Sequence, residues 1–183
     1  MIKRVFSKIS RVLRYVLLLI KKNRSISCPK MTNLSLSTEI KAVNGGSIRL
    51  EKMVTTLQRV SLIANGGELT IGEYVGINRN CIFVCKEKIV IGEHCAFGPN
   101  VVIFDHDHVF DQNGYHMEEF KTTPVIIEKN CWIGGNVTFL RGAHVGEGSV
   151  IGAGCIIKCE IPAHSLVIPT DGVRIEKLRE NKD

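Results

Sequence analysis

The first 38 of the 183 residues contain no Asp or Glu, the chain has no long hydrophobic run, and its seven cysteines include no C-x-x-C pair. The apolar run 15–20 is only six residues long, far short of the ~20 that a helix needs to cross a bilayer, so this segment cannot span a membrane. The cysteine usage, together with the lack of a secretory cleavage signature, favours a reducing cytoplasm. The length suits one folded domain with an appendage and excludes a multidomain machine.

The net charge of +6 belongs to one end of the chain. Residues 1–38 hold nine of the 24 Lys and Arg residues, whereas the remaining 145 residues carry 15 basic against 18 acidic groups, a net charge of −3. A nucleic-acid partner would be expected if the basic charge ran through the folded domain. Its confinement to the N-terminal end instead predicts no nucleic-acid binding.

Apolar residues within 2–22 follow the three-to-four spacing of an amphipathic helix, with Lys and Arg on the opposite face. We expect this helix to lie on an anionic membrane surface, each basic residue adding about 1 kcal/mol of attraction. The alternative is a helix packed against its own domain or against a partner helix. Cys28 and Pro29 end the helix and begin a linker, so residues 1–38 are predicted to be helix and linker.

Internal repetition dominates the rest of the chain. The stretch 44–50 (NGGSIRL) recurs as 65–71 (NGGELTI), and similar apolar-x-apolar triplets begin at Ile89 and Val125. Within these units a large apolar residue returns every six positions. The series comprises Ile71, Ile77, Phe83, Ile91, Phe97, Ile103, Ile127, Ile133, Phe139, Val145, Ile151 and Ile157.

A period of six fits neither an α-helix nor a simple alternating strand, but it fits a coil of three short flat faces with one inward side chain on each. Three such hexads make an 18-residue coil, and Gly often follows the inward residue, where it permits a corner. Coils start at about residues 50, 71, 91 and 127; the long last interval predicts an inserted loop at about 105–122. We therefore expect an all-β solenoid from 39 to 168 and a C-terminal tail from 169 to 183.

Four cysteines share one slot of this repeat, four positions after the inward residue, where Val, Ala or Ser stands in other hexads. They are Cys81, Cys95, Cys131 and Cys155. A small, weakly polar side chain suits that slot, so we expect them to be packing residues rather than zinc ligands.

Three stretches carry a family resemblance: 71–80 (IGEYVGINRN), 97–108 (FGPNVVIFDHDH) and 130–137 (NCWIGGNV). The sequence resembles the hexapeptide-repeat acyltransferases, and most of all their maltose/galactoside O-acetyltransferase branch and the relatives that acetylate surface polysaccharides. The resemblance implies a left-handed parallel β-helix, a homotrimer with active sites between subunits, and acetyl-CoA as acyl donor. Periodicity alone does not give the handedness, because parallel crossovers are ordinarily right-handed.

The resemblance places the catalytic histidine at His108, with His106 as the reserve and a contact to the acceptor. Imidazole titrates near neutrality and suits a base that takes a hydroxyl proton. A carboxylate that fixes the imidazole tautomer is expected; Glu119 matches the family spacing, and Glu118 and Asp105 are alternatives. Asn78 would orient the acceptor hydroxyl, although a corner Asn has an equally plain structural role.

On the donor side the resemblance implies that backbone amides near Gly134 and Gly135 face the thioester carbonyl and that Trp132 lines the pantetheine groove. Trp132 could equally be a packing residue. Ala153 and Lys158 occupy positions that contact the coenzyme, with Lys158 or Arg174 able to meet phosphate. The His106 and His108 pair could offer two metal ligands, but the other histidines do not follow the spacing of the β-helix carbonic anhydrases, so no metal is expected.

The sequence therefore predicts an acetyl-CoA-dependent O-acetyltransferase acting by direct transfer on a sugar hydroxyl. The basic N-terminal segment favours a lipid-linked glycan at the cytoplasmic face of the cell membrane, as in capsule, exopolysaccharide or lipopolysaccharide synthesis. One alternative is an N-acetyltransferase of a nucleotide-linked amino sugar, or a xenobiotic acetyltransferase. The other is a noncatalytic β-helix scaffold at the membrane.

Overall fold

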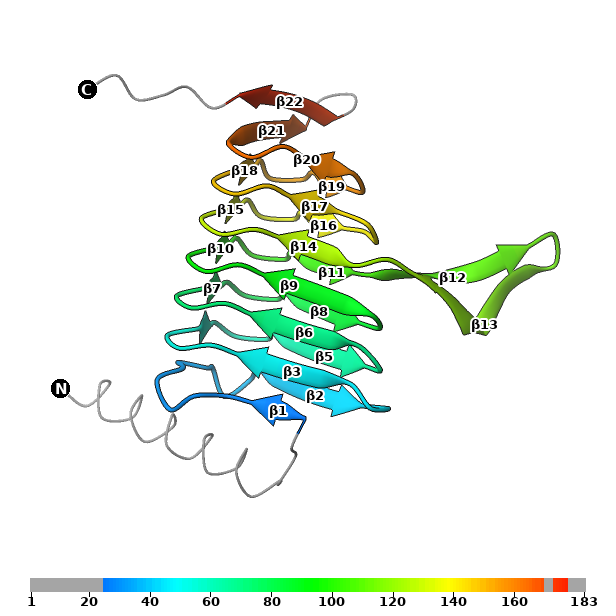
Figure 1. Cartoon of the computed structure of the whole chain (residues 1–183), viewed down its shortest axis with the longest axis horizontal. Coiled ribbons are helices and arrows are strands. Elements are labelled where there is room, and N and C mark those ends of the chain that lie inside the picture. Colours follow the sequence, from blue (N-terminus) through cyan, green and yellow to red (C-terminus); the bar gives the residue numbers. More distant parts are fainter. Residues whose placement is uncertain (1–24, 170–172, 178–183) are drawn as a thin grey trace.

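A computed structural model describes residues 25–169 and 173–177, with side chains up to residue 169. The described chain is all-β and winds as stacked coils into a three-walled prism, the parallel β-helix that the six-residue period predicted (Figure 1). The amphipathic helix and membrane contact predicted for 2–22 lie outside the described residues. In the part of the chain that is described, no helix is long and apolar enough to cross a membrane.

Three sheets form the walls, and neighbouring strands within each wall come from successive coils. The first sheet contains β1 (Ile26–Ser27), β3 (Ser47–Leu50), β6 (Glu68–Ile71), β9 (Lys88–Ile91), β14 (Val125–Ile127), β17 (His144–Val145) and β20 (Glu160–Ile161). The second contains β4 (Thr55–Thr56), β7 (Gly76–Ile77), β10 (Ala96–Phe97), β15 (Trp132–Ile133), β18 (Val150–Ile151), β21 (Ser165–Pro169) and β22 (Val173–Lys177). The third contains β2 (Glu39–Val43), β5 (Ser61–Asn65), β8 (Ile82–Cys85), β11 (Val102–Phe104), β16 (Thr138–Phe139) and β19 (Ile156–Ile157).

The inward residues of successive coils stack directly on one another. In the first sheet Ile71 pairs with Ile91, and Ile91 pairs with Ile127, in parallel register. All three side chains are at most 1% exposed, and each contributes roughly 1.5–3 kcal/mol of burial. The core is therefore a column of aliphatic side chains along the prism axis, as the hexads predicted.

The four cysteines of the small-residue slot are buried free thiols, which confirms their assignment as packing residues. Burial raises the pKa of the Cys81 thiol to about 11, and burial likewise raises the pKa of Cys155. Cys81 and Cys155 are therefore protonated at neutral pH.

The inserted segment lies where the long coil interval predicted it, and its chain forms an antiparallel hairpin. Strands β12 (His106–Asp111) and β13 (Gly114–Thr122) pair with each other and project from the prism between β11 and β14 (Figure 1). The register shifts between His108 and Val109. The hairpin therefore carries both candidate histidines on its first strand.

The solenoid extends beyond both predicted boundaries. Strand β1 pairs with β3, and Leu34 joins the core, so folded structure begins within residues 1–38, the segment predicted to be helix and linker. Strand β22 pairs antiparallel with β21, inside the predicted tail. The hexad pattern missed both ends because neither strand carries the repeat's spacing.

Candidate functional site

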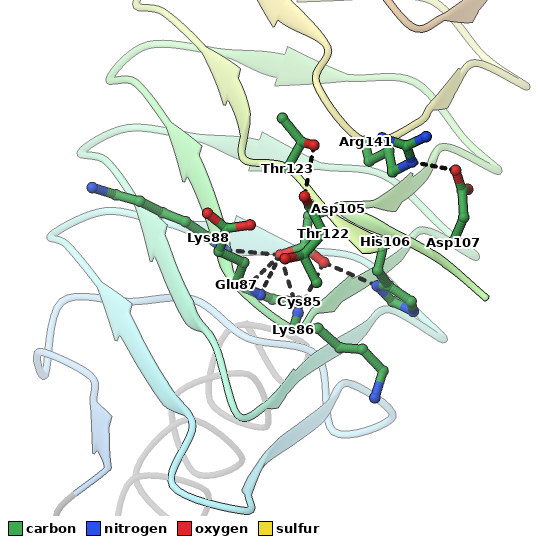
Figure 2. A network of polar contacts seen from close by, with 10 residues as sticks. All are labelled: Cys85, Lys86, Glu87, Lys88, Asp105, His106, Asp107, Thr122, Thr123 and Arg141. Atoms are coloured by element: carbon green, nitrogen blue, oxygen red, sulfur yellow. Dashed lines mark hydrogen bonds and ion pairs between the residues drawn. The ribbon is translucent and has the colours of Figure 1, made fainter. Parts of the chain in front are cut away.

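The base of the hairpin is anchored by Asp105, which directly follows β11 and is completely buried. Its carboxylate accepts backbone N–H groups of the turn between β8 and β9: Lys86 at 2.8 Å, Glu87 at 2.7 Å and Lys88 at 2.8 Å (Figure 2). A single side chain thus ties the start of the hairpin to the preceding coil. An ionised carboxylate is suited to this place because three donors converge on it.

Burial alone would raise the pKa of Asp105, but the hydrogen bonds from His106 and from the Glu87 and Lys86 amides outweigh it and hold the pKa below its ordinary value. Oδ1 of Asp105 lies 2.9 Å from Nδ1 of His106. Because the carboxylate only accepts, Nδ1 carries the proton, and Nε2 of a neutral imidazole keeps its lone pair. The rings of Phe104 and Phe120 contact His106 edge-on, at centroid distances of 5.7 and 5.6 Å.

His108 is exposed on the same face of the hairpin. Its Nδ1 lies 3.1 Å from the carbonyl oxygen of His116, and a carbonyl only accepts, so Nδ1 is again the donor and Nε2 is left free. The ring packs on Phe120 at a centroid distance of 4.5 Å and on Tyr115 at 5.5 Å. Both histidines therefore contact Phe120, in agreement with their two-residue spacing on an extended strand.

Glu119 contacts a different imidazole from the one that the sequence assigned to it. Its Oε1 lies 3.0 Å from Nδ1 of His116, whose Nε2 is 3.2 Å from Asp111. Glu119, followed by Asp111, raises the pKa of His116. Instead of Glu119, a backbone carbonyl orients His108, and the alternative carboxylate, Asp105, orients His106.

A second contact that anchors the hairpin was not predicted from the sequence. Nε of Arg141, in the turn between β16 and β17, donates to the carboxylate of Asp107 (Figure 2). Asp107 stands between the two histidines and is half exposed. The alternation of a strand could have suggested that Asp107 faces away from them, but its partner is distant in the chain and shares no motif with it.

The predicted donor-side residues gather, with one exception, at the corner between the second and third sheets. Trp132 is 57% exposed on β15, Gly135 lies in the next turn, and Ala153 is exposed one coil further on. The Gly135 N–H has no protein acceptor among the described residues and is free to meet a carbonyl oxygen. The exception is Lys158, which follows β19 and lies at the corner between the third and first sheets.

The backbone amide of Gly134 has a structural role, which excludes the predicted contact of this amide with the thioester carbonyl. Its N–H donates to the carbonyl of Ile151 at 2.7 Å, so this amide is not available to a thioester carbonyl. A Cβ at Gly134 would lie 2.5 Å from the backbone nitrogen of Ala153, a distance that real side chains do not tolerate. Close stacking of two coils therefore requires this glycine.

Asn78 stands two coils before Gly134 on the same corner. Its Oδ1 accepts the N–H of Arg79 at 2.8 Å, which fulfils the structural role of a corner Asn. Its side-chain nitrogen Nδ2 donates no hydrogen bond to another described residue, so it remains available to an acceptor.

One prism does not bring the two halves of this site together. The histidines stand where the third sheet meets the first, whereas Gly135 and Asn78 stand where the second meets the third. The third sheet separates the two corners, and the hairpin projects away from the prism (Figure 1). Among the described residues, no three His, Cys, Asp or Glu side chains are grouped as a metal site would need.

The fold and the repeat define a hexapeptide-repeat β-helix protein, and comparison with known proteins agrees. The family model described as the hexapeptide repeat of succinyl-transferase matches residues 124–159. A candidate acetyltransferase of Schizosaccharomyces pombe is 34% identical over 113 residues, covering 62% of this chain and 55% of its own. The chain thus spans about half the length of the curated relatives it matches.

Solved structures share the architecture. A maltose O-acetyltransferase from Clostridium difficile 630 is 26% identical, with a TM-score of 0.54 over 83% of this chain and 72% of that one. A variant of an N-acyltransferase from Bacillus cereus, in complex with dTDP-4-amino-4,6-dideoxyglucose and coenzyme A, has a TM-score of 0.75 over 89% and 88% at 21% identity. The described β-helix is thus similar in sequence and in fold to hexapeptide-repeat acetyltransferases, as the sequence motifs predicted, and its stacked parallel coils are consistent with a left-handed β-helix.

Proposed function

We propose that the protein is an acetyl-CoA-dependent O-acetyltransferase that acts on a sugar hydroxyl, with His108 as general base. The observation that carries this proposal is the state of the His108 imidazole: Nδ1 donates to a backbone carbonyl, and Nε2 is free on an exposed ring. A neutral imidazole held in this tautomer accepts a hydroxyl proton at Nε2. The maltose O-acetyltransferase among the similar structures supports this acceptor class.

The chemistry is direct transfer between two bound substrates. Nε2 of His108 takes the hydroxyl proton while the hydroxyl oxygen bonds to the thioester carbonyl carbon, and the C–S bond then breaks. Coenzyme A leaves as a thiol after its sulfur receives the proton. The free N–H of Gly135 is suited to stabilise the oxyanion, and the exposed face of Trp132 is suited to the pantetheine arm.

We further propose that the active unit is a homotrimer in which the hairpin corner of one subunit meets the Gly135 corner of its neighbour. This assembly would unite the two halves that lie apart in one chain. Light scattering of the purified protein gives its molar mass, and we expect three times the mass of one chain. A catalytically active monomer would contradict this arrangement.

The basic N-terminal segment supports a location at the inner face of the cell membrane, with a lipid-linked glycan of the surface polysaccharides as acceptor. Deletion of residues 1–24, which leaves β1 in place, tests the location through co-sedimentation with vesicles that contain anionic lipid. We expect the full chain to sediment with the vesicles and the shortened chain to remain in solution. Equal sedimentation of both would contradict the proposal.

The acceptor is tested by supplying acetyl-CoA with a labelled acetyl group, together with the protein, to a cell extract. If the label is found in a glycan and mild alkali releases it as acetate, the product is an O-acetyl ester. Alkali-stable label on a nucleotide-linked amino sugar would favour the N-acetyltransferase alternative, and no thioester cleavage at all would favour a noncatalytic scaffold.

A further inference from the structure

The corner between the second and third sheets carries a groove that the proposed chemistry does not use. Its volume is about 460 Å³, and Ser37, Gln58, Arg59 and Arg79 line it. All four side chains belong to turns of successive coils, and both arginines are exposed. We call this feature the arginine groove.

Charge at this corner is of one sign only. Its six turns, at 36–37, 58–59, 79–80, 99–100, 135–136 and 153–154, contain no acidic residue, and Arg59 and Arg79 are their only charged groups. Throughout the described part of the chain, neither arginine forms an ion pair. The two turns that carry these arginines belong to neighbouring coils, whose backbones are about 4.8 Å apart along the axis, so both side chains can reach the same anion.

The corner between the first and second sheets shows that this arrangement is not general to the fold. There a basic residue in one turn pairs with an acidic residue in the next coil: Lys52 with Glu73 at 3.6 Å, and Lys129 with Glu147 at 3.5 Å. At that corner each lysine thus has an acidic partner in the next coil. The arginine groove differs from it, because its two arginines have no acidic residue in any turn of their corner.

The residue type at position 59 adds an independent observation. Arg59 has a φ of 58°, in the left-handed region that disfavours long L side chains. The same turn position in the next three coils is occupied by Asn80, Asn100 and Asn136, whose side chains form a ladder with bonds of 2.9 and 3.0 Å. Met53, Tyr74 and His94 have the same left-handed φ at another corner, so this conformation belongs to the repeat. What distinguishes Arg59 is that it forgoes the asparagine ladder and places a second cation beside Arg79.

The groove lies beside the acceptor side of the proposed site. Arg79 directly follows Asn78, and Gly135 lies two coils further along the same corner, about 10 Å away at the usual strand spacing. A charged group held here would therefore sit away from the reacting hydroxyl, elsewhere on the same acceptor. Arginine forks bind phosphate oxygens in pairs, and two forks suit a phosphate or diphosphate group.

Resting on the proposed function, we propose that the arginine groove binds a phosphate group of the acceptor, so that the substrate class is a phosphate-bearing glycan. Coenzyme A also carries phosphates and is the other source of the same chemistry. The groove and the coenzyme are therefore tested separately.

The test measures binding of inorganic pyrophosphate by calorimetry, in low salt and with coenzyme A present in excess, to the full chain. The variant Arg59→Gln/Arg79→Gln removes both guanidinium groups but keeps chain length. The control Lys41→Gln/Arg49→Gln removes the same charge from exposed positions on the third and first sheets. Affinity for coenzyme A is measured for each protein in parallel.

We expect the arginine variant to bind pyrophosphate at least ten times more weakly than wild type, the control to stay within twofold, and coenzyme A affinity to stay within twofold in both. Three results overturn the proposal: unchanged pyrophosphate binding, an equal loss in the control, or a parallel loss of coenzyme A binding. Wild-type protein that binds pyrophosphate through these arginines but does not bind coenzyme A would support the groove and contradict the proposed function.

Discussion

Nδ1 of His106 lies 2.9 Å from Oδ1 of Asp105, whose carboxylate also accepts the amides of an entire turn of the preceding coil. The relationship connects the fold to the site, because the same buried side chain closes the prism wall and fixes the imidazole at the base of the hairpin. His106 is thus held by structure, whereas His108, two residues on, is exposed.

Replacement of Asp105 by Asn should lower the free energy of unfolding by about 2–3 kcal/mol, because an amide group turns donors toward the backbone N–H groups that the carboxylate accepted. Urea denaturation at pH 7 measures the change. Asp107→Asn is the control; its ion pair with Arg141 is half exposed, so a loss below about 1 kcal/mol is expected.

The same Asp105 variant tests the pH dependence. The pKa of Asp105 is lowered by folding, so its contribution is fully present above the ordinary Asp pKa of about 4 and is lost as pH falls through the folded value. Wild type should therefore lose stability below about pH 4 more steeply than Asp105→Asn. Parallel stability curves for the two proteins in acid would contradict the role given to this carboxylate.

Two adjacent glycines should respond differently to alanine. In Gly134→Ala the new methyl group meets backbone at 2.5 Å, and overpacking of this kind costs about 1–3 kcal/mol. In Gly135→Ala the nearest atoms are those of Pro99 at 3.3 Å, so a smaller loss is expected. Thermal unfolding monitored by circular dichroism separates them, and equal losses would refute the close stacking at Gly134.

The tip of the hairpin should be pH sensitive through His116. Glu119 and Asp111 raise its pKa, so their stabilising contacts are complete below about pH 6.5 and are lost as pH rises through the folded pKa. We expect an NMR titration of the His116 ring to give a midpoint above that of an unfolded reference peptide. In Glu119→Gln the midpoint of the His116 titration should move to lower pH. An unchanged midpoint would contradict the contact between Glu119 and His116.

The hexad spacing was sufficient to predict a parallel β-solenoid, though not its handedness, because one inward residue such as Ile91 per face specifies both the coil and its stacking partners. The place of the insertion followed from the same arithmetic. The hairpin's internal contacts did not: the pairing of Glu119 with His116 depends on the register of β12 and β13, including the shift after His108. Spacing along the chain cannot reveal that register.

The corner residues illustrate the same limit. The sequence suggested that the amides of both Gly134 and Gly135 face the thioester carbonyl. The backbone hydrogen bonds between coils use the amide of Gly134, however, and leave that of Gly135 free. Corner lysines such as Lys52 pair with an acidic residue of the neighbouring coil, whereas Arg59 and Arg79 have no such neighbour. Which residues become neighbours depends on which turns stack on one another. Only the three-dimensional register brings these turns together.

The most direct test of the account is the rate of coenzyme A release from acetyl-CoA by His108→Ala and by His106→Ala, with the unmodified glycan that the labelling experiment identifies as acceptor. Loss of a general base costs about 10²- to 10⁴-fold, so we expect His108→Ala to lose at least 100-fold while His106→Ala retains most of the activity. An unchanged rate in His108→Ala would contradict the assignment of His108 as the base.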